Sequence, residues 1–410
     1  MKPILTVRPG GYLLEWDTPP ISIESRRVRS HRDGRLTAFI KVKVLGEVSP
    51  GHLHGADFNL ASTAARTTLS KVLTERYEAD WYAILEQLCD YVREAHERGE
   101  PVQEIWSHED PGPLKYLVRP LLPLGHPAII FGDGGSLKST IGQILALVVV
   151  LPWEHNPLGL VPPAEVTPAL YLDWEADEDE FRWRLHAIGA GMKLPATPLL
   201  YRRMALPLAD DMEAVSSFIA DYSIRFLVID SLGAAAGGDL NATEPCLRLF
   251  AALRQLHVTS LMLAHNSKDQ LTKRRSVYGN VHYTNYARSV WEARKAQEEN
   301  SPEAHLALFH RKWNRQHFPP QGFEFTFSDS TVSARRADVR DMAALRDQLT
   351  IPGQILAELR DGPLTKNSLD ESLAGTAATV ISTSLTRLKK SGKVVLLPDG
   401  QWGLAVPSDT

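Results

Sequence analysis

The stretch Pro127–Thr140, PAIIFGDGGSLKST, joins a short apolar strand to a glycine-rich turn and to a helix that opens at Lys138. Glycines tolerate the positive φ values that let successive backbone N–H groups point inward at an anion. The N-terminus of the following helix adds its dipole and its unpaired N–H groups at the same place. The stretch therefore predicts a cradle for nucleotide phosphates.

The turn follows the P-loop pattern GxxxxGK[ST] at all but one position. In that pattern the lysine contacts the β- and γ-phosphates and the next hydroxyl ligates Mg²⁺, so we expect Lys138 and Ser139 to bind ATP and Mg²⁺. Glycine is required before the lysine, but this chain has Leu137. An ordinary tight strand-to-helix turn is the alternative. The predicted nucleotide-binding residues are Gly132, Asp133, Gly134, Gly135, Ser136, Leu137, Lys138, Ser139 and Thr140.

The composition is that of an ordinary soluble protein with more than one domain. The chain has 410 residues, of which 43% are hydrophobic and 23% charged, and this length suggests two or three domains. A net charge of −4 gives no overall basic signal, so contacts with nucleic acid must come from local patches. The two cysteines are far apart in sequence, and the apolar run 141–151 is too short to span a bilayer. We therefore expect a cytoplasmic protein without membrane contact.

Residues 1–115 are predicted to form a small α+β domain that contacts a partner or another subunit. Strand-like alternation at 12–16 and 36–45 precedes two helical patterns, at about 60–77 and 80–97. His52 and His54 lie in GHLHG without a third metal ligand in view, so we interpret this segment as a polar loop. Residues 107–113 are expected to be a linker.

Residues 116–335 alternate between apolar strands and helices, which predicts an α/β fold with a mostly parallel sheet covered on both faces. The helices are expected at 180–188, 212–221 and 244–256. The strands are expected at 128–131, 169–173, 199–201, 226–230, 260–264, 289–293, 305–310 and 322–327.

Residues 350–410 predict a winged-helix domain. Three helices, at 354–360, 367–373 and 377–391, precede a hairpin at 393–404 whose turn is Asp399-Gly400. The third helix ends with Lys389 and Lys390, which makes these two residues candidates for DNA contacts. Contact with a protein is the alternative role for such a module.

Two apolar strands end in acidic residues suited to phosphoryl transfer. The strand 226–230 ends at Asp230, which can hold a Mg²⁺-bound water, and it is followed by Ser231 rather than glutamate. The strand 169–173 delivers Asp173, Trp174 and Glu175 to the carboxyl edge of the sheet, where ligands bind in such folds. We expect Glu175 to be the general base; the start of a charged helix is the alternative.

The chain from about Leu117 to Phe327 resembles the RecA-like ATPase core, and most closely the branch that contains the RepA-type hexameric plasmid helicases. The resemblance rests on GDGGSLKST, ALYLDWE, FLVIDSLGAAAGGDLNATE and LMLAHNSKD, in this order and at similar spacing. It implies that Glu175 is catalytic and that His265, with Asn266 beside it, senses the γ-phosphate. It also implies a homo-oligomeric, hexameric ring.

The resemblance also indicates nucleic-acid contacts. In RecA-like proteins, loops at the position of 267–275 line the channel and contact single-stranded nucleic acid, so Lys273, Arg274 and Arg275 are candidates for phosphate contacts. A solvated surface loop is the alternative.

A cationic segment, HRKWNR at 310–315, resembles the place where ring helicases present a lysine and an arginine finger to the neighbouring subunit. The candidates are Lys312 and Arg315, with Arg311 as an alternative. An inserted cation of this kind accelerates phosphoryl transfer by orders of magnitude.

Three functions follow from these patterns. The first is an ATP-dependent DNA helicase on single-stranded DNA, with partner proteins from plasmid, phage or mobile-element replication. The second is a DNA-bound regulator or loader that switches its assembly with ATP and does not unwind. The third is a nucleotide-binding scaffold that contacts no nucleic acid.

Overall fold

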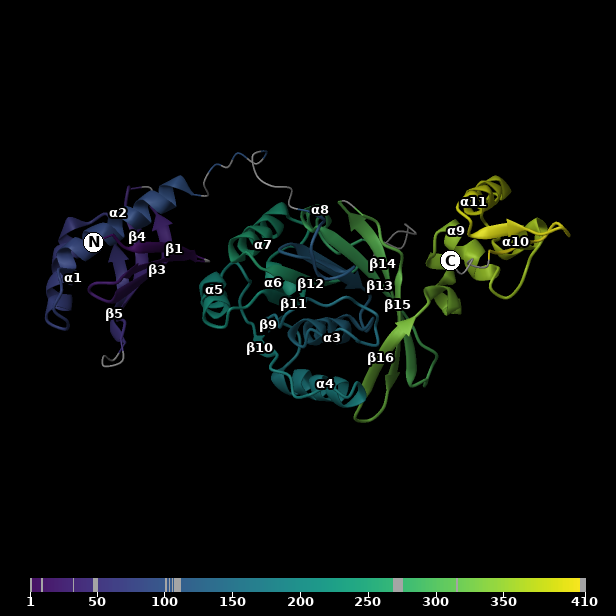
Figure 1. Cartoon of the computed structure of the whole chain (residues 1–410), viewed down its shortest axis with the longest axis horizontal. Coiled ribbons are helices and arrows are strands. Elements are labelled where there is room, and N and C mark those ends of the chain that lie inside the picture. The colour runs from purple at the N-terminus through teal and green to yellow at the C-terminus, as the bar shows by residue number, and fades with distance from the viewer. Residues whose placement is uncertain are drawn as a thin grey trace.

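A nine-stranded sheet forms the middle of the chain in the computed structural model (Figure 1). The structure describes residues 2–405 apart from 9, 32, 47–50, 100, 101, 103, 105, 107–111, 268–275 and 315. In the sheet the order is β10 (Leu200–Arg203), β9 (Ala169–Asp173), β11 (Phe226–Asp230), β12 (Thr259–His265), β8 (Pro127–Gly132), β13 (Ser289–Ala296), β14 (Glu303–Trp313), β15 (Gln321–Phe327) and β16 (Val332–Ala337). The strands from β10 to β13 are parallel, and β14, β15 and β16 extend the sheet antiparallel.

Helices cover both faces of the parallel part, because its strands are apolar on both sides. In β8, Ile130 packs with α3 (Lys138–Val150) and α4 (Glu178–Gly191). Its neighbours Ile129 and Phe131 pack on the other face with α5 (Met212–Asp221), α6 (Leu232–Ala236) and α7 (Thr243–Leu256). The predicted α/β class with a mostly parallel sheet is confirmed, and the additional strand β16 was not predicted.

The N-terminal part forms a separate antiparallel sheet with two helices, which is the predicted α+β arrangement. Its strands are β1 (Ile4–Arg8), β2 (Gly11–Trp16), β3 (Ile21–Ser30), β4 (Leu36–Val44) and β5 (His52–Asn59), in that order. Helices α1 (Thr63–Thr74) and α2 (Trp81–Arg98) pack on it around Trp16 and Trp81. The interpretation of GHLHG as a loop was wrong, since His52 and His54 lie in β5, paired with β4. The predicted linker lies from 107 to 111 outside the described residues.

The C-terminal part contains the three predicted helices and the predicted hairpin in the expected order. They are α9 (Ile351–Glu358), α10 (Lys366–Ser372), α11 (Ala378–Lys390), β17 (Val394–Leu396) and β18 (Trp402–Leu404). Gly400 adopts φ +82°, as the turn between the two strands requires. The helices enclose a small core around Ile355, Leu369 and Ile381. The winged-helix assignment and the domain boundaries stay predictions.

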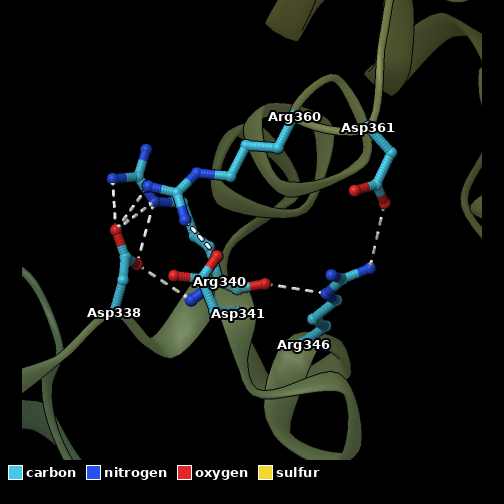
Figure 2. Close-up of polar contacts among 6 residues, drawn as sticks. All are labelled: Asp338, Arg340, Asp341, Arg346, Arg360 and Asp361. Carbon is cyan, nitrogen blue, oxygen red and sulfur yellow. Dashed lines mark hydrogen bonds and ion pairs between the residues drawn. The ribbon is translucent and has the colours of Figure 1, made fainter.

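Two short 3-10 helices, η2 (Val339–Asp341) and η3 (Ala343–Gln348), connect β16 to α9. Charged side chains of this segment contact one another (Figure 2). Asp338 accepts hydrogen bonds from Arg340, at 2.6 Å for the shortest, and from Arg360, at 2.9 Å. The hydrogen bonds from Arg340 are the main reason that the pKa of Asp338 is lowered to about 2. Arg360 also pairs with Asp341. Ion pairs thus connect the residues after β16 with Arg360, which follows α9.

Shorter elements complete the chain. A two-stranded sheet of β6 (Tyr116–Val118) and β7 (Leu122–Pro123) precedes β8, and α8 (His282–Tyr286) precedes β13. Among the described residues, no helix combines the length and the apolar character needed to cross a bilayer.

Candidate functional site

The loop between β8 and α3 forms an open turn at the carboxyl edge of the parallel strands. Ser136 closes the turn by donating from its backbone N–H (3.3 Å) and its hydroxyl (2.7 Å) to the carbonyl of Asp133. Gly135 adopts φ +68°, and a Cβ atom at Gly134 or Gly135 would meet no heavy atom within 4 Å. Gly132 has no such freedom, since a Cβ atom there would lie 2.5 Å from the carbonyl oxygen of Ala293. The loop therefore has open space beside Gly134 and Gly135, whereas Gly132 is packed against β13.

Leu137 has a left-handed backbone conformation, with φ 63° and ψ 20°, directly before the first residue of α3. This is the position at which the P-loop pattern requires glycine, and the geometry gives the reason. A side chain in this conformation costs about 1–2 kcal/mol, which glycine avoids. The loop thus adopts a glycine-type conformation with a leucine, whose side chain packs in part against the core beneath α3.

Lys138 lies inside the loop. Its Nζ donates hydrogen bonds to the carbonyl oxygens of Gly132 (3.1 Å) and Asp133 (2.7 Å). The residue is only 8% exposed. Burial lowers the pKa of this ammonium group, while nearby carboxylates, Asp230 first among them, oppose the shift. The cation is thus held within the turn, where a phosphate bound by the loop would meet it.

Asp230, Ser139 and Tyr171 form a buried polar cluster next to the loop. Asp230 ends β11, is 5% exposed and accepts a 2.7 Å hydrogen bond from the hydroxyl of Tyr171 to its Oδ2. The hydroxyl of Ser139, in the first turn of α3, also lies close enough to lower the pKa of Asp230. Burial raises the pKa of Asp230, and the nearby hydroxyls of Ser139 and Tyr171 oppose the shift. The cluster thus places the predicted metal-binding carboxylate and hydroxyl near each other.

Glu175 and His265 meet at the same edge, although they are far apart in sequence. Asp173 accepts hydrogen bonds at one oxygen from the backbone N–H groups of Glu175 (2.9 Å) and Ala176 (3.0 Å), which fixes the chain where it leaves β9. The Oε1 of Glu175 lies 3.6 Å from Nε2 of His265, and these side chains are 46% and 51% exposed. Both are therefore open to solvent and able to reach a bound group.

Asn266 links the end of β12 to the phosphate loop. Its Nδ2 donates a 2.8 Å hydrogen bond to Oδ1 of Asp133. The residue beside the predicted phosphate sensor is therefore attached to the loop itself.

The residues at this edge fit Mg²⁺-ATP. A hollow of about 600 Å³ lies over the loop, lined by Asp133, Gly134, Gly135, Ser136, Lys295 of β13 and residues 297–301 of the β13–β14 turn. No cluster of three or more His, Cys, Asp or Glu side chains suited to a metal occurs in the described part of the chain. Mg²⁺ in nucleotide sites needs none, because it is held by one or two protein groups together with phosphates and water. Ser139 and Asp230 provide such groups.

Sequence comparison agrees with this site. Residues 93–271 match the family model of an AAA domain. The matched segment contains Lys138, Glu175, Asp230 and His265, and it supports an ATPase of the P-loop type. No curated protein matches the chain. Among solved structures, a KaiC-like protein from the hyperthermophilic archaeon Pyrococcus horikoshii OT3 is 15% identical with a TM-score of 0.37, and the alignment covers 54% of this chain and 99% of that one.

The candidate finger residues lie away from the loop. Lys312 pairs with Val290 in β13, near the amino edge of the parallel strands, whereas Ala293 further along β13 pairs with Gly132 at the loop. Arg315 lies outside the described residues. Arg311 is held by Glu292, with its Nε 2.7 Å from Oε2. Their predicted role toward a neighbouring subunit stays a prediction.

Lys312 has a structural role that the sequence did not indicate. Its Nζ donates to the carbonyl oxygens of Thr284 (2.8 Å), Asn285 (2.6 Å) and Ala287 (2.6 Å), and so caps the C-terminal end of α8. Burial lowers the pKa of this group. To reach a neighbouring phosphate, the ammonium group would have to leave all three oxygens.

The DNA-contact candidates are only partly described. Lys273, Arg274 and Arg275 lie outside the described residues. Lys389 lies over the ring of Trp402, 5.9 Å from its centroid, at the junction of α11 and the hairpin. Lys390 is exposed at the last position of α11.

Sequence reasoning missed Tyr171 in this site. The hydrogen bond to Asp230 arises because β9 and β11 are adjacent, with Asp173 opposite Asp230 in the register. The available signal was a tyrosine in an otherwise aliphatic strand two positions before Asp173. A buried phenol needs a polar partner, and the ends of neighbouring strands supply one.

Proposed function

We propose that this protein is an ATP-hydrolysing, RecA-like ring ATPase that acts on single-stranded DNA, as a RepA-type helicase of plasmid, phage or mobile-element replication. The observation that carries the ATPase part is the meeting of Lys138, Asp230, Glu175 and His265 at one edge of the sheet. These residues come from separate segments, and each supplies a group that phosphoryl transfer requires.

In this proposal the side chains have distinct tasks. The loop N–H groups and Lys138 bind the phosphates, and Glu175 accepts a proton from the attacking water. His265 lies beside that carboxylate, from where it can contact the terminal phosphate. Ser139 and Asp230 hold Mg²⁺, which when bound neutralises charge on the phosphate oxygens.

The ring part of the proposal is supported by the position of the cationic segment. Lys312 and the next strand position, 313, lie toward the amino edge of the parallel strands, opposite the chain's own phosphate loop. Cations at that edge can act on a nucleotide only in a second copy of the chain. A ring in which each subunit faces the next would provide that contact.

The experiment is the steady-state ATPase rate with and without single-stranded DNA, with Lys138→Ala as the blank. Strong stimulation by DNA is expected, followed by strand displacement on a tailed duplex. A rate that equals the Lys138→Ala blank would overturn the ATPase proposal.

A second candidate is a DNA-bound regulator or loader that binds ATP without unwinding. It is favoured by Leu137, which places a strained side chain in the phosphate loop. A slow ATPase that ignores DNA, together with nucleotide-dependent assembly and no strand displacement, would identify this second function.

A further inference from the structure

We propose that Tyr171 is a positioning residue for the metal site, which orients the carboxylate of Asp230 toward Mg²⁺. This inference rests on the proposed ATPase function. It goes beyond it by assigning a role to a residue of the neighbouring strand that touches neither nucleotide nor metal.

The contact itself is short and buried. The hydroxyl of Tyr171 donates to Oδ2 of Asp230 at 2.7 Å, and Tyr171 is 1% exposed. Hydrogen bonds from a hydroxyl to a carboxylate at this distance belong to the strong class, and they strengthen further where water is excluded. The bond therefore holds one oxygen of the carboxylate in a defined place.

The orientation of this carboxylate matters because its own torsion is soft. The terminal torsion of an aspartate is broad and roughly two-fold, so the side chain alone does not decide where its oxygens point. The hydrogen bond from the hydroxyl of Tyr171 restricts that rotation, because it holds Oδ2 of Asp230. Residues that hydrogen-bond a metal ligand without contacting the metal typically change metal affinity 10–100-fold when they are removed.

The tyrosine ring is fixed independently of its hydroxyl. Phe181 of α4 packs against it, with ring centroids 4.8 Å apart. On the side of α3, a Cβ atom added at Gly142 would lie 3.7 Å from the hydroxyl oxygen, so the helix passes closely. Removing only the hydroxyl should leave the ring in place.

Burial alone does not explain the hydrogen bond of Tyr171. Tyr201 in β10 also packs on Phe181, with centroids 4.4 Å apart, and its buried hydroxyl has no hydrogen-bond partner among the described residues. The two tyrosines thus share an aromatic cluster and differ in whether the hydroxyl reaches a carboxylate. Tyr201→Phe is therefore a matched control for Tyr171→Phe.

The test measures nucleotide binding rather than turnover. The affinity of the full-length protein for a fluorescent ATP analogue is determined over a series of Mg²⁺ concentrations and in EDTA. For Tyr171→Phe we expect the Mg²⁺ concentration at half-maximal binding to rise about tenfold, with the affinity in EDTA unchanged. Tyr201→Phe should match the wild type in both conditions.

The outcomes separate this inference from the proposed function. A wild type that responds to Mg²⁺ and a Tyr171→Phe variant with the same Mg²⁺ dependence would overturn the inference alone. Equal loss of affinity with Mg²⁺ and in EDTA would also overturn it, because a general packing defect acts in both conditions. A wild type that binds no nucleotide would overturn the proposed function, and the inference with it.

Discussion

Nε2 of His265 lies 3.6 Å from Oε1 of Glu175, which brings the ends of β12 and β9 together beside the phosphate loop. These two strands are not adjacent in the sheet, since β11 lies between them. The pair therefore depends on the parallel arrangement, in which the carboxyl ends of neighbouring strands share one edge.

Glu175→Gln should lower the ATPase rate at least 100-fold and leave nucleotide affinity within about twofold, because the amide keeps the shape and cannot accept the proton. Rate and binding are measured on the same preparation. Glu178→Gln, in the acidic run that follows, is the control, since that side chain is 63% exposed and pairs with Arg182 in the same helix. Normal turnover by Glu175→Gln would show that another group is the base.

Replacing Leu137 tests the strain in the phosphate loop. Leu137→Gly removes both the unfavourable left-handed side chain and its packing, whereas Leu137→Ala removes the packing and keeps most of the strain. We expect the glycine variant to be more stable than the alanine variant by about 1 kcal/mol. Urea unfolding measures the difference, and two variants of equal stability would show that the leucine conformation carries no strain.

His310 should make the protein less stable as the pH falls from about 6.5 to about 4. Its ring is stacked on Trp291, with centroids 4.2 Å apart, and its Nδ1 accepts a hydrogen bond from the backbone of Phe318. Burial, with a smaller effect of His317, lowers the pKa of His310 to about 4. The unfolded chain, with a pKa of about 6.5, thus binds a proton in this window that the folded chain does not.

The expected cost is roughly 2 kcal/mol at pH 5 relative to pH 7. His310→Asn keeps an acceptor for Phe318 and cannot titrate, so it should lose that part of the pH dependence whatever its stability at pH 7. His155→Asn, at an exposed position, is the control. Identical pH dependence of wild type and His310→Asn would contradict the assignment.

Lys312→Met should lower the free energy of unfolding by about 1–3 kcal/mol, because three carbonyl oxygens at the end of α8 lose their donor. Lys43→Met, at an exposed position of β4, should have little effect. Thermal or urea unfolding tests the cap. An unchanged stability together with a lost ATPase rate would instead favour the role of Lys312 toward a neighbouring subunit.

The parts of the fold that were predicted correctly have local signals. Apolar runs lead to Asp173, Asp230 and His265, and the phosphate loop adds glycines followed by Lys138. Because parallel strands end at one edge, the meeting of these residues could be expected before their distances were known.

The parts that were missed depend on contacts between distant segments. The three oxygens around Lys312 belong to the backbone 25 to 28 residues earlier, and backbone atoms have no sequence signature. The hydrogen bond of Tyr171 depends on the register between β9 and β11, which local patterns do not encode. β5 was missed because its polar, histidine-containing sequence becomes a strand through pairing with β4.

The ion pairs of Asp338 join the end of β16 to the residues directly after α9, so they close the intervening segment into a loop. Unwinding of α9 would release Arg360, and release of Arg360 would loosen η2, because both depend on the same carboxylate. The backbone amides of α9 and of the two 3-10 helices should therefore exchange with deuterium at a common rate, as one cooperative unit that opens before the sheet does.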